Sequence, residues 1–155
     1  MSSWILLYLH VTPEWKKRAI DEVKSFIAQY ADKADTEDLP SLLSAIPPEV
    51  WDESMPVLDL CLRETIRTVL SVISLRRVLN DDGVKINGVK VDKGGFVAYS
   101  FAETHFNENI YNDPERWDPG RYEKGEDKKE QYAFLGWGVG ESTDRSKVSQ
   151  SRRLT

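Results

Sequence analysis

The residues in this sequence whose spacing best suits chemistry are an acid and a base in a Glu-x-x-Arg pair. Glu64 and Arg67 lie three residues apart, so both side chains fall on one face of a helix. A planar guanidinium can hold a carboxylate through two parallel hydrogen bonds. Arg121 lies between Pro119 and Tyr122 in a later stretch, and taken alone it would be an exposed loop residue. Taken alone, a Glu-x-x-Arg pair is more often a surface ion pair worth about a few tenths of a kcal/mol.

Side chains that bind metals or act as nucleophiles are scarce. The chain has one cysteine, Cys61, and two histidines, His10 and His105, which lie far apart with no ligand-type spacing around them. We therefore expect no disulfide and no zinc or di-iron site. The net charge of -5 argues against a nucleic-acid-binding protein, which normally carries a basic face.

The sequence contains signals for several helices, one of which would carry the Glu-x-x-Arg pair. Thr12-Pro13-Glu14 is typical of a helix start, and Ser54 followed by Pro56 predicts another, which would carry Glu64 and Arg67. The apolar run 4–9 is shorter than the roughly 20 residues that span a bilayer, and it predicts the buried end of a helix. Further expectations are a short helix over 42–46 stopped by Pro47-Pro48, and an apolar face on the second helix made by Leu58, Leu62, Ile66 and Val69.

The pattern after this helix indicates strands and then an irregular loop. Asn87-Gly88 between two alternating runs predicts a hairpin, because Asn-Gly suits the type I′ turn. A third strand is expected over 96–101 after a Gly-Gly turn. The stretch 107–121 is rich in Asn, Asp and Pro and predicts an ordered loop.

The order of these motifs resembles the cytochromes P-450, the haem-thiolate monooxygenases. The segment 113–122 is similar to the family's Pro-x-x-aromatic unit followed by Pro-x-Arg-aromatic, and Trp137-Gly138-Val139-Gly140 is similar to the first half of its haem-ligand loop. The resemblance implies that Glu64, Arg67 and Arg121 form a buried triad behind the haem. It also implies that Trp137, Gly138 and Gly140 contact haem, that His105 is structural, and that Arg77, with Arg76 as the alternative, meets a haem propionate.

The resemblance breaks where the iron ligand should be. Counting from Trp137, the family's cysteine would fall at position 144, which is Asp144, and no cysteine follows. Cys61 could be proposed as a substitute, but its leucine neighbours indicate an inert buried thiol. Segment 141–155 holds two aliphatic residues among serines and charges, so we expect a disordered tail. Codons for Gly-Glu-Ser can contain GTGAGT, an intron donor, so translated intron is an open alternative.

The sequence therefore predicts an α+β, mainly helical fold: the incomplete C-terminal part of the cytochrome P-450 fold. Residues 1–140 would run from the end of the long oxygen-binding helix to the start of the haem-ligand loop. The intact family implies haem, a reductase supplied by NADPH, a small lipophilic substrate and the endoplasmic reticulum membrane. No anchor is expected here, so this chain would be cytoplasmic or of unknown location. We therefore expect a fragment of a monooxygenase that resembles fungal members of the family. As written, the fragment would be inactive. The alternative is that the chain is a haem-free interaction domain.

Overall fold

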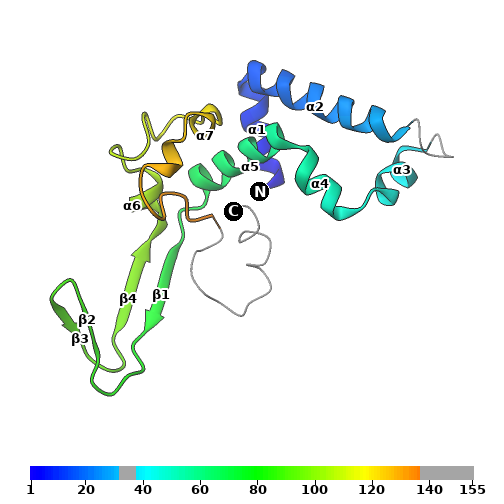
Figure 1. The fold of residues 1–155 in the computed structure, drawn as a ribbon. Coiled ribbons are helices and arrows are strands. Elements are labelled where there is room, and N and C mark those ends of the chain that lie inside the picture. Colours follow the sequence, from blue (N-terminus) through cyan, green and yellow to red (C-terminus); the bar gives the residue numbers. More distant parts are fainter. Residues whose placement is uncertain (32–37, 137–155) are drawn as a thin grey trace.

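The computed structural model describes residues 1–31 and 38–136, in which helices are followed by two small antiparallel sheets and a long loop. Figure 1 shows the ribbon of β1 and β4 projecting away from the helices, while the loop that follows returns to lie beside α5. The elements are α1 (Ser2–Val11), α2 (Pro13–Ala31), α3 (Leu39–Ala45), α4 (Pro48–Ser54), α5 (Pro56–Val69), β1 (Ile73–Arg77), β2 (Val84–Ile86), β3 (Val89–Val91), β4 (Phe96–Ser100), α6 (Phe101–His105), α7 (Gly120–Glu123) and the 3₁₀ helix η1 (Glu126–Lys128).

Helices α1, α2 and α5 pack together around one of the hydrophobic clusters. Trp15 of α2, Cys61 of α5 and Trp117 of the loop are its buried members, with partly buried residues of α1 against them. The expected helix over 4–9 is confirmed, but its expected burial is wrong. Leu6 keeps 66% of its surface exposed and α1 has no buried residue, because no described residue covers its outer face.

The N-terminus of α5 is capped by a residue from another helix. The predicted cap, Ser54, is the last residue of α4, and Met55 at the cap position makes no side-chain bond. Instead, both carboxylate oxygens of Glu22 on α2 accept hydrogen bonds, from the backbone N–H groups of Val57 and Leu58, each at 2.8 Å. Free N–H groups in a first turn favour an anion. Glu22 therefore fixes the start of the helix that carries Glu64 and Arg67.

A second cluster joins the middle helices. Phe26, Ile46 and Met55 are its buried members. Helix α3 ends before Pro47 as predicted, and Asp38 caps its start by accepting from the Ser41 N–H at 3.1 Å. However, Pro48 also begins α4, which the sequence interpretation did not include; proline is well suited to the first helical position.

The two sheets form where the turn residues of the sequence predict strands. Strands β2 and β3 pair with Ile86 opposite Val89, and the turn residues Asn87 and Gly88 have φ angles of 46° and 85°, as a type I′ turn needs. Strand β4 matches the predicted third strand to within a residue and pairs with β1, from Ile73↔Ser100 to Arg77↔Phe96.

One face of the β1–β4 ribbon is apolar and exposed. The register places Ile73, Leu75 and Phe96 on the same face, and each keeps more than half of its surface exposed. Large apolar side chains gathered in this way are unusual on the surface of a monomer. Among the described residues, none of the helices is long and apolar enough to cross a membrane.

Candidate functional site

The candidate site is a buried cluster of charges around the Glu64 carboxylate. Arg67 donates from Nε to Glu64 Oε2 at 2.9 Å and from Nη2 to Oε1 at 2.8 Å, which is a two-pronged contact. Arg121 Nε, 57 residues further along the chain, donates to the same Oε1 at 3.0 Å. All three side chains are at most 1% exposed. The structure thus brings together the three residues that the resemblance to the family grouped as a triad.

The buried face of α5 is polar at this point, which changes the predicted apolar face. Leu62 is exposed, whereas Cys61, Glu64, Thr65 and Arg67 are fully buried. The reason is the loop after α6, which lies across this side of the helix: the backbone N–H of Asp118 donates to Glu64 Oε1 at 3.0 Å. The helix thus buries its charged groups under the loop that they hold.

Arg67 binds the backbone of that loop through its remaining N–H groups. Nη1 donates to the carbonyl of His105 at 2.5 Å, and Nη2 donates to the carbonyls of Pro114 at 2.8 Å and Arg116 at 3.4 Å. An arginine side chain has five N–H donors and no acceptor, so carbonyl oxygens complete its hydrogen bonding without adding charge. The Arg67 side chain therefore connects helix α5 to both the start and the middle of the loop.

Arg121 closes the loop on itself and adds a second carboxylate. Its Nη1 donates to Glu126 Oε2 at 2.8 Å and to the Asn112 carbonyl at 3.0 Å, and its Nη2 donates to the Arg116 carbonyl at 2.9 Å. Burial alone lowers the pKa of Arg121, but the carboxylates of Glu64 and Glu126 outweigh it and raise this pKa. Two guanidinium groups thus meet two carboxylates, and the cluster carries no net charge, as burial requires.

Glu126 was not found by the sequence interpretation. It precedes the glycine loop in a run of charged residues, and no periodic pattern distinguishes it from its neighbours. Its Oε2 also accepts from the backbone N–H of Asn112 at 3.0 Å. One signal could have found it: if two arginines are buried, a second acid is needed beside Glu64 to balance their charge.

Tyr111 fills the space between the two guanidinium groups. Its ring centre lies 4.9 Å from Cζ of Arg67 and 5.6 Å from Cζ of Arg121, within the range of cation–π attraction. The hydroxyl donates to the Ala133 carbonyl at 3.0 Å, and burial raises the pKa of this phenol. A neutral tyrosine therefore joins the charge cluster to the segment just before the glycine loop.

His105 makes a second connection to that segment. Its Nε2 accepts from the backbone N–H of Leu135 at 3.2 Å, and its ring stacks on Phe134 with 5.9 Å between centres. Burial, and secondarily the charge of Arg67, lower the pKa of His105 to about 4, so the ring is neutral at pH 7. The backbone carbonyl of the same residue accepts from Arg67, so His105 contacts both the cluster and the start of the glycine loop.

Arg63 supports the same segment from the outer side of α5. It donates to Asp127 at 2.7 Å, and its guanidinium lies 4.3 Å from the ring centre of Tyr122 and 4.9 Å from that of Phe134. Sequence reasoning passed over this residue, since a lone arginine next to Glu64 has no distinguishing spacing. The stretch 133–135 is thus held by Tyr111, His105 and Arg63.

Cys61 is the inert buried thiol that the sequence predicted. It is fully buried, and burial raises its pKa to about 12. Thr65 donates to its backbone carbonyl at 2.7 Å and accepts from the Trp117 indole N–H at 3.2 Å. A thiol in this environment does not ionise near neutral pH, and it lies inside the hydrophobic cluster with the two tryptophans.

The residues predicted to contact haem are only partly described. Arg77 ends β1 with an exposed side chain, 5.9 Å from the ring centre of Phe96, and Arg76 is exposed on the opposite face of the strand. Neither contacts the charge cluster in any recorded bond, so both propionate assignments stay predictions. Trp137, Gly138, Gly140 and Asp144, and the predicted tail at 141–155, lie outside the described residues.

In the described stretches 1–31 and 38–136, neither Cys61 nor His105 is free to serve as an iron ligand. No group of three or more His, Cys, Asp or Glu side chains is placed there to hold a metal ion. The Cys61 thiol is buried and protonated, and Nε2 of His105 already accepts the Leu135 N–H. Chemically, the cluster can hold and orient the backbone of 105–135.

Comparison with known proteins gives a consistent result. The family profile described as Cytochrome P450 matches residues 1–142. The chain is 35% identical over 144 residues to cytochrome P450 monooxygenase AacuE of Aspergillus aculeatus, covering 90% of this chain and 28% of that protein. It is 32% identical to cytochrome P450 monooxygenase dmxR5 of Cryptosporiopsis sp., covering 83% of this chain and 25% of that protein. A third relative, nsrP of Aspergillus novofumigatus, is 31% identical over 88% of this chain.

A solved structure shares the fold. The retinoic acid-bound cyanobacterial CYP120A1 superposes with a TM-score of 0.62 at 24% identity, over 86% of this chain and 28% of that one. The chain therefore spans about a quarter of the length of the relatives that it matches. The three curated relatives come from fungi, as the resemblance implied.

Proposed function

The chain belongs to the cytochrome P450 family, and from that premise we propose that it forms the supporting segment of a haem-thiolate monooxygenase, without that activity in the sequence as written. Residues 1–140 would correspond to the C-terminal part of the fold, up to the start of the haem-ligand loop. The observation that carries this proposal is the buried cluster of Glu64, Arg67 and Arg121 and its connection through His105 to Leu135. That connection orients the backbone directly before the glycine loop.

The proposed lack of activity rests on the missing thiolate. The position that would hold the ligand is Asp144, and the only cysteine of the chain is Cys61, which is buried in a hydrophobic cluster. A cysteine thiolate is the ligand through which this class of haem protein favours cleavage of the O–O bond. A carboxylate cannot supply that donation. Residues 141–155, for which translated intron is an open alternative, contain no other thiol.

The activity of the longer relatives suggests the function of a complete protein that contains this segment. They are named cytochrome P450 monooxygenases, and for a protein that contains this segment in full context we propose haem, a reductase fed by NADPH and a small lipophilic substrate. We also propose that such a protein is held at the endoplasmic reticulum membrane. In that context Arg77, Trp137, Gly138 and Gly140 would face the haem.

Haem reconstitution tests the proposal. The purified 155-residue chain is incubated with haemin, reduced and exposed to carbon monoxide, with Cys61→Ala as the matched variant. We expect no thiolate-type absorption band in either protein. A band in the wild-type chain that disappears in Cys61→Ala would assign the thiolate to Cys61 and overturn the proposal. A band present in both cannot come from this chain, because Cys61→Ala contains no thiol.

A second candidate function is a haem-free interaction domain. The exposed apolar face of the β1–β4 ribbon, with Ile73, Leu75 and Phe96, favours it. Limited proteolysis separates the two candidates. A domain that works alone should resist protease in its helices, whereas a segment that serves a larger fold should be cut in α1, which has no buried residue.

A further inference from the structure

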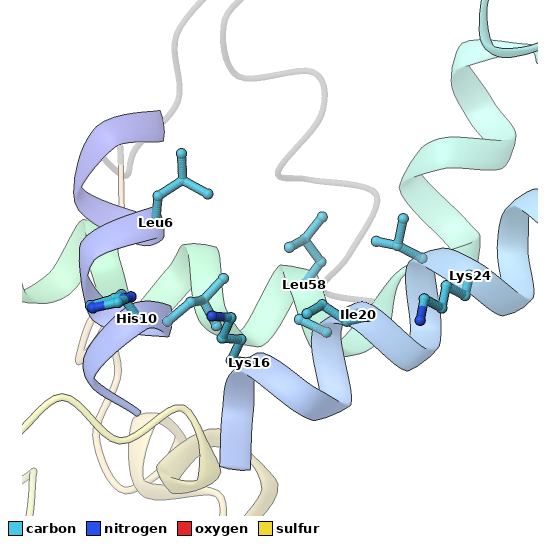
Figure 2. Close-up of a pocket in the computed structure, with 9 residues that line it drawn as sticks. Leu6, His10, Lys16, Ile20, Lys24 and Leu58 are labelled. Carbon is cyan, nitrogen blue, oxygen red and sulfur yellow. The ribbon is translucent and has the colours of Figure 1, made fainter. Parts of the chain in front are cut away.

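A groove of about 500 Å³ lies between α1, α2 and α5, away from the charge cluster. Figure 2 shows Leu6 and His10 on α1, Lys16, Ile20 and Lys24 along α2, and Leu58 on α5. Leu9, Ala19 and Val23 complete its lining. A volume in the range of about 300–1,000 Å³ with a mostly apolar wall is typical of sites for small molecules.

The charged groups at this groove are all of one sign. Lys16, Ala19, Ile20, Val23 and Lys24 recur at helical spacing, so they share one face of α2 with a lysine at each end. The two lysines are eight residues apart, or roughly 12 Å along the helix axis. No acidic side chain lines the groove among the described residues.

The two lysines differ in their acidic neighbours: the charge of Lys24 helps to lower the pKa of Asp21, after the larger effect of Lys17. Within the described part of the chain, no ion pair is recorded for Lys16 or Lys24, whereas their neighbour Lys17 is paired with Asp21 at 2.8 Å. Glu22, which lies on the same helix, is used by the N–H groups of Val57 and Leu58. The groove therefore offers an apolar floor with a positive rim, and its complement is a molecule with a hydrocarbon body and an anionic end.

We propose that this groove binds a single-chain amphiphile with a carboxylate head. The hydrocarbon chain lies along Ile20, Val23 and Leu58, and the carboxylate meets the ammonium group of Lys16 or Lys24. Burial of the chain supplies most of the affinity, because each CH₂ group that is removed from water adds to it. The lysines supply the preference for an anion over a neutral molecule of the same length.

Three probes of equal length test the charge preference on the full wild-type chain. Decanoate, decanol and decylammonium are titrated by calorimetry at pH 7, each below its micelle concentration. We expect decanoate to bind roughly tenfold tighter than decanol, and decylammonium to bind most weakly. The preference should shrink as salt is raised, because the lysines are exposed and screened. Equal binding of all three probes, or no binding of decanoate, would overturn the proposal.

Charge reversal tests the location. The double variant Lys16→Glu with Lys24→Glu should lose the preference for decanoate and favour decylammonium. The matched control is Lys85→Glu with Lys129→Glu, which changes the net charge equally at exposed positions outside the groove. A preference that the control loses and the groove variant keeps would refute the assignment. If circular dichroism shows the groove variant to be unfolded, Lys16→Gln with Lys24→Gln replaces it and should abolish the preference.

A second copy of this chain is the competing occupant of the groove. Sedimentation of the wild-type chain with and without decanoate distinguishes it from the amphiphile. Monomers at all concentrations, or dimers that decanoate dissociates, support the proposal. Dimers that persist at saturating decanoate and block its binding would show that the groove belongs to a protein interface instead.

Discussion

Arg67 donates hydrogen bonds to both carboxylate oxygens of Glu64, at 2.9 and 2.8 Å, from a position three residues further along the same helix. Both side chains are fully buried. On an exposed helix face the same pair would contribute little, because water competes for each charge. Here the two side chains are also bonded to Arg121 and to loop carbonyls. The pair therefore acts as the anchor for a loop rather than as a local helix contact.

Replacing Glu64 should destabilise the fold strongly. The substitution Glu64→Gln leaves Arg67 and Arg121 buried with one carboxylate, Glu126, between them. An uncompensated buried charge costs about 3–5 kcal/mol. The measurement is the free energy of unfolding in urea, followed by circular dichroism. The control, Glu123→Gln, removes an exposed partner of Arg18 and should cost less than about 1 kcal/mol. Equal losses in the two variants would show that the cluster does not anchor the loop.

Removing the cap supplied by Glu22 should loosen the start of α5. In Glu22→Ala the N–H groups of Val57 and Leu58 lose their acceptors. We expect a loss of about 1–2 kcal/mol in unfolding free energy and faster hydrogen exchange at these two amides. The control is Glu49→Ala, an acid in the first turn of α4 with no recorded bond to α5. Unchanged exchange at Val57 and Leu58 would contradict the capping role.

His105 should make stability depend on pH between about 4 and 6.5. Its pKa in the folded chain is lowered to about 4 by burial, against 6.5 when exposed, so the folded state favours the neutral ring. Its contribution is therefore complete above pH 6.5 and is lost as the pH falls toward 4, by about 3 kcal/mol at most. Unfolding midpoints across this range, compared between wild type and His105→Gln, isolate the effect from that of the carboxylates. Parallel pH profiles for the two proteins would contradict the assignment.

The Cys61 thiol should be unreactive in the folded chain. Burial raises its pKa to about 12, and the nucleophile in thiol exchange is the thiolate. With a disulfide reagent at pH 8 we expect reaction only at the rate of unfolding, and rapid reaction in urea. Fast labelling of the native protein would place the thiol at the surface. It would also reopen Cys61 as a candidate iron ligand.

Local patterns predicted local structure well in this chain. The hairpin at Asn87-Gly88 was readable because a two-residue turn depends only on the φ angles that those residues tolerate. The start of α2 at Pro13 was readable for the same reason. Glu64, Arg67 and Arg121 were found through the resemblance of whole motifs, since no local pattern links positions 57 residues apart.

The parts that the sequence could not supply depend on how segments meet in space. Glu22 caps a helix that begins more than thirty residues later, so the interpretation assigned that role to the nearby Ser54. Glu126 became visible only once the loop path brought it to Arg121. The exposure of Leu6 was missed because an apolar run predicts burial, and the pattern does not reveal whether a covering segment is present.

The way in which the two buried arginines hold the loop has a consequence for which substitutions the chain can accept. Apart from the acids, their partners are main-chain carbonyls, at His105, Asn112, Asp113, Pro114 and Arg116. Every amino acid offers the same carbonyl, so the bonds survive a change of side chain at these positions wherever the backbone angles are kept. Mutational tolerance should therefore be high at Asn112 and Arg116 of the loop, and low at Arg121 and at Arg67 of α5.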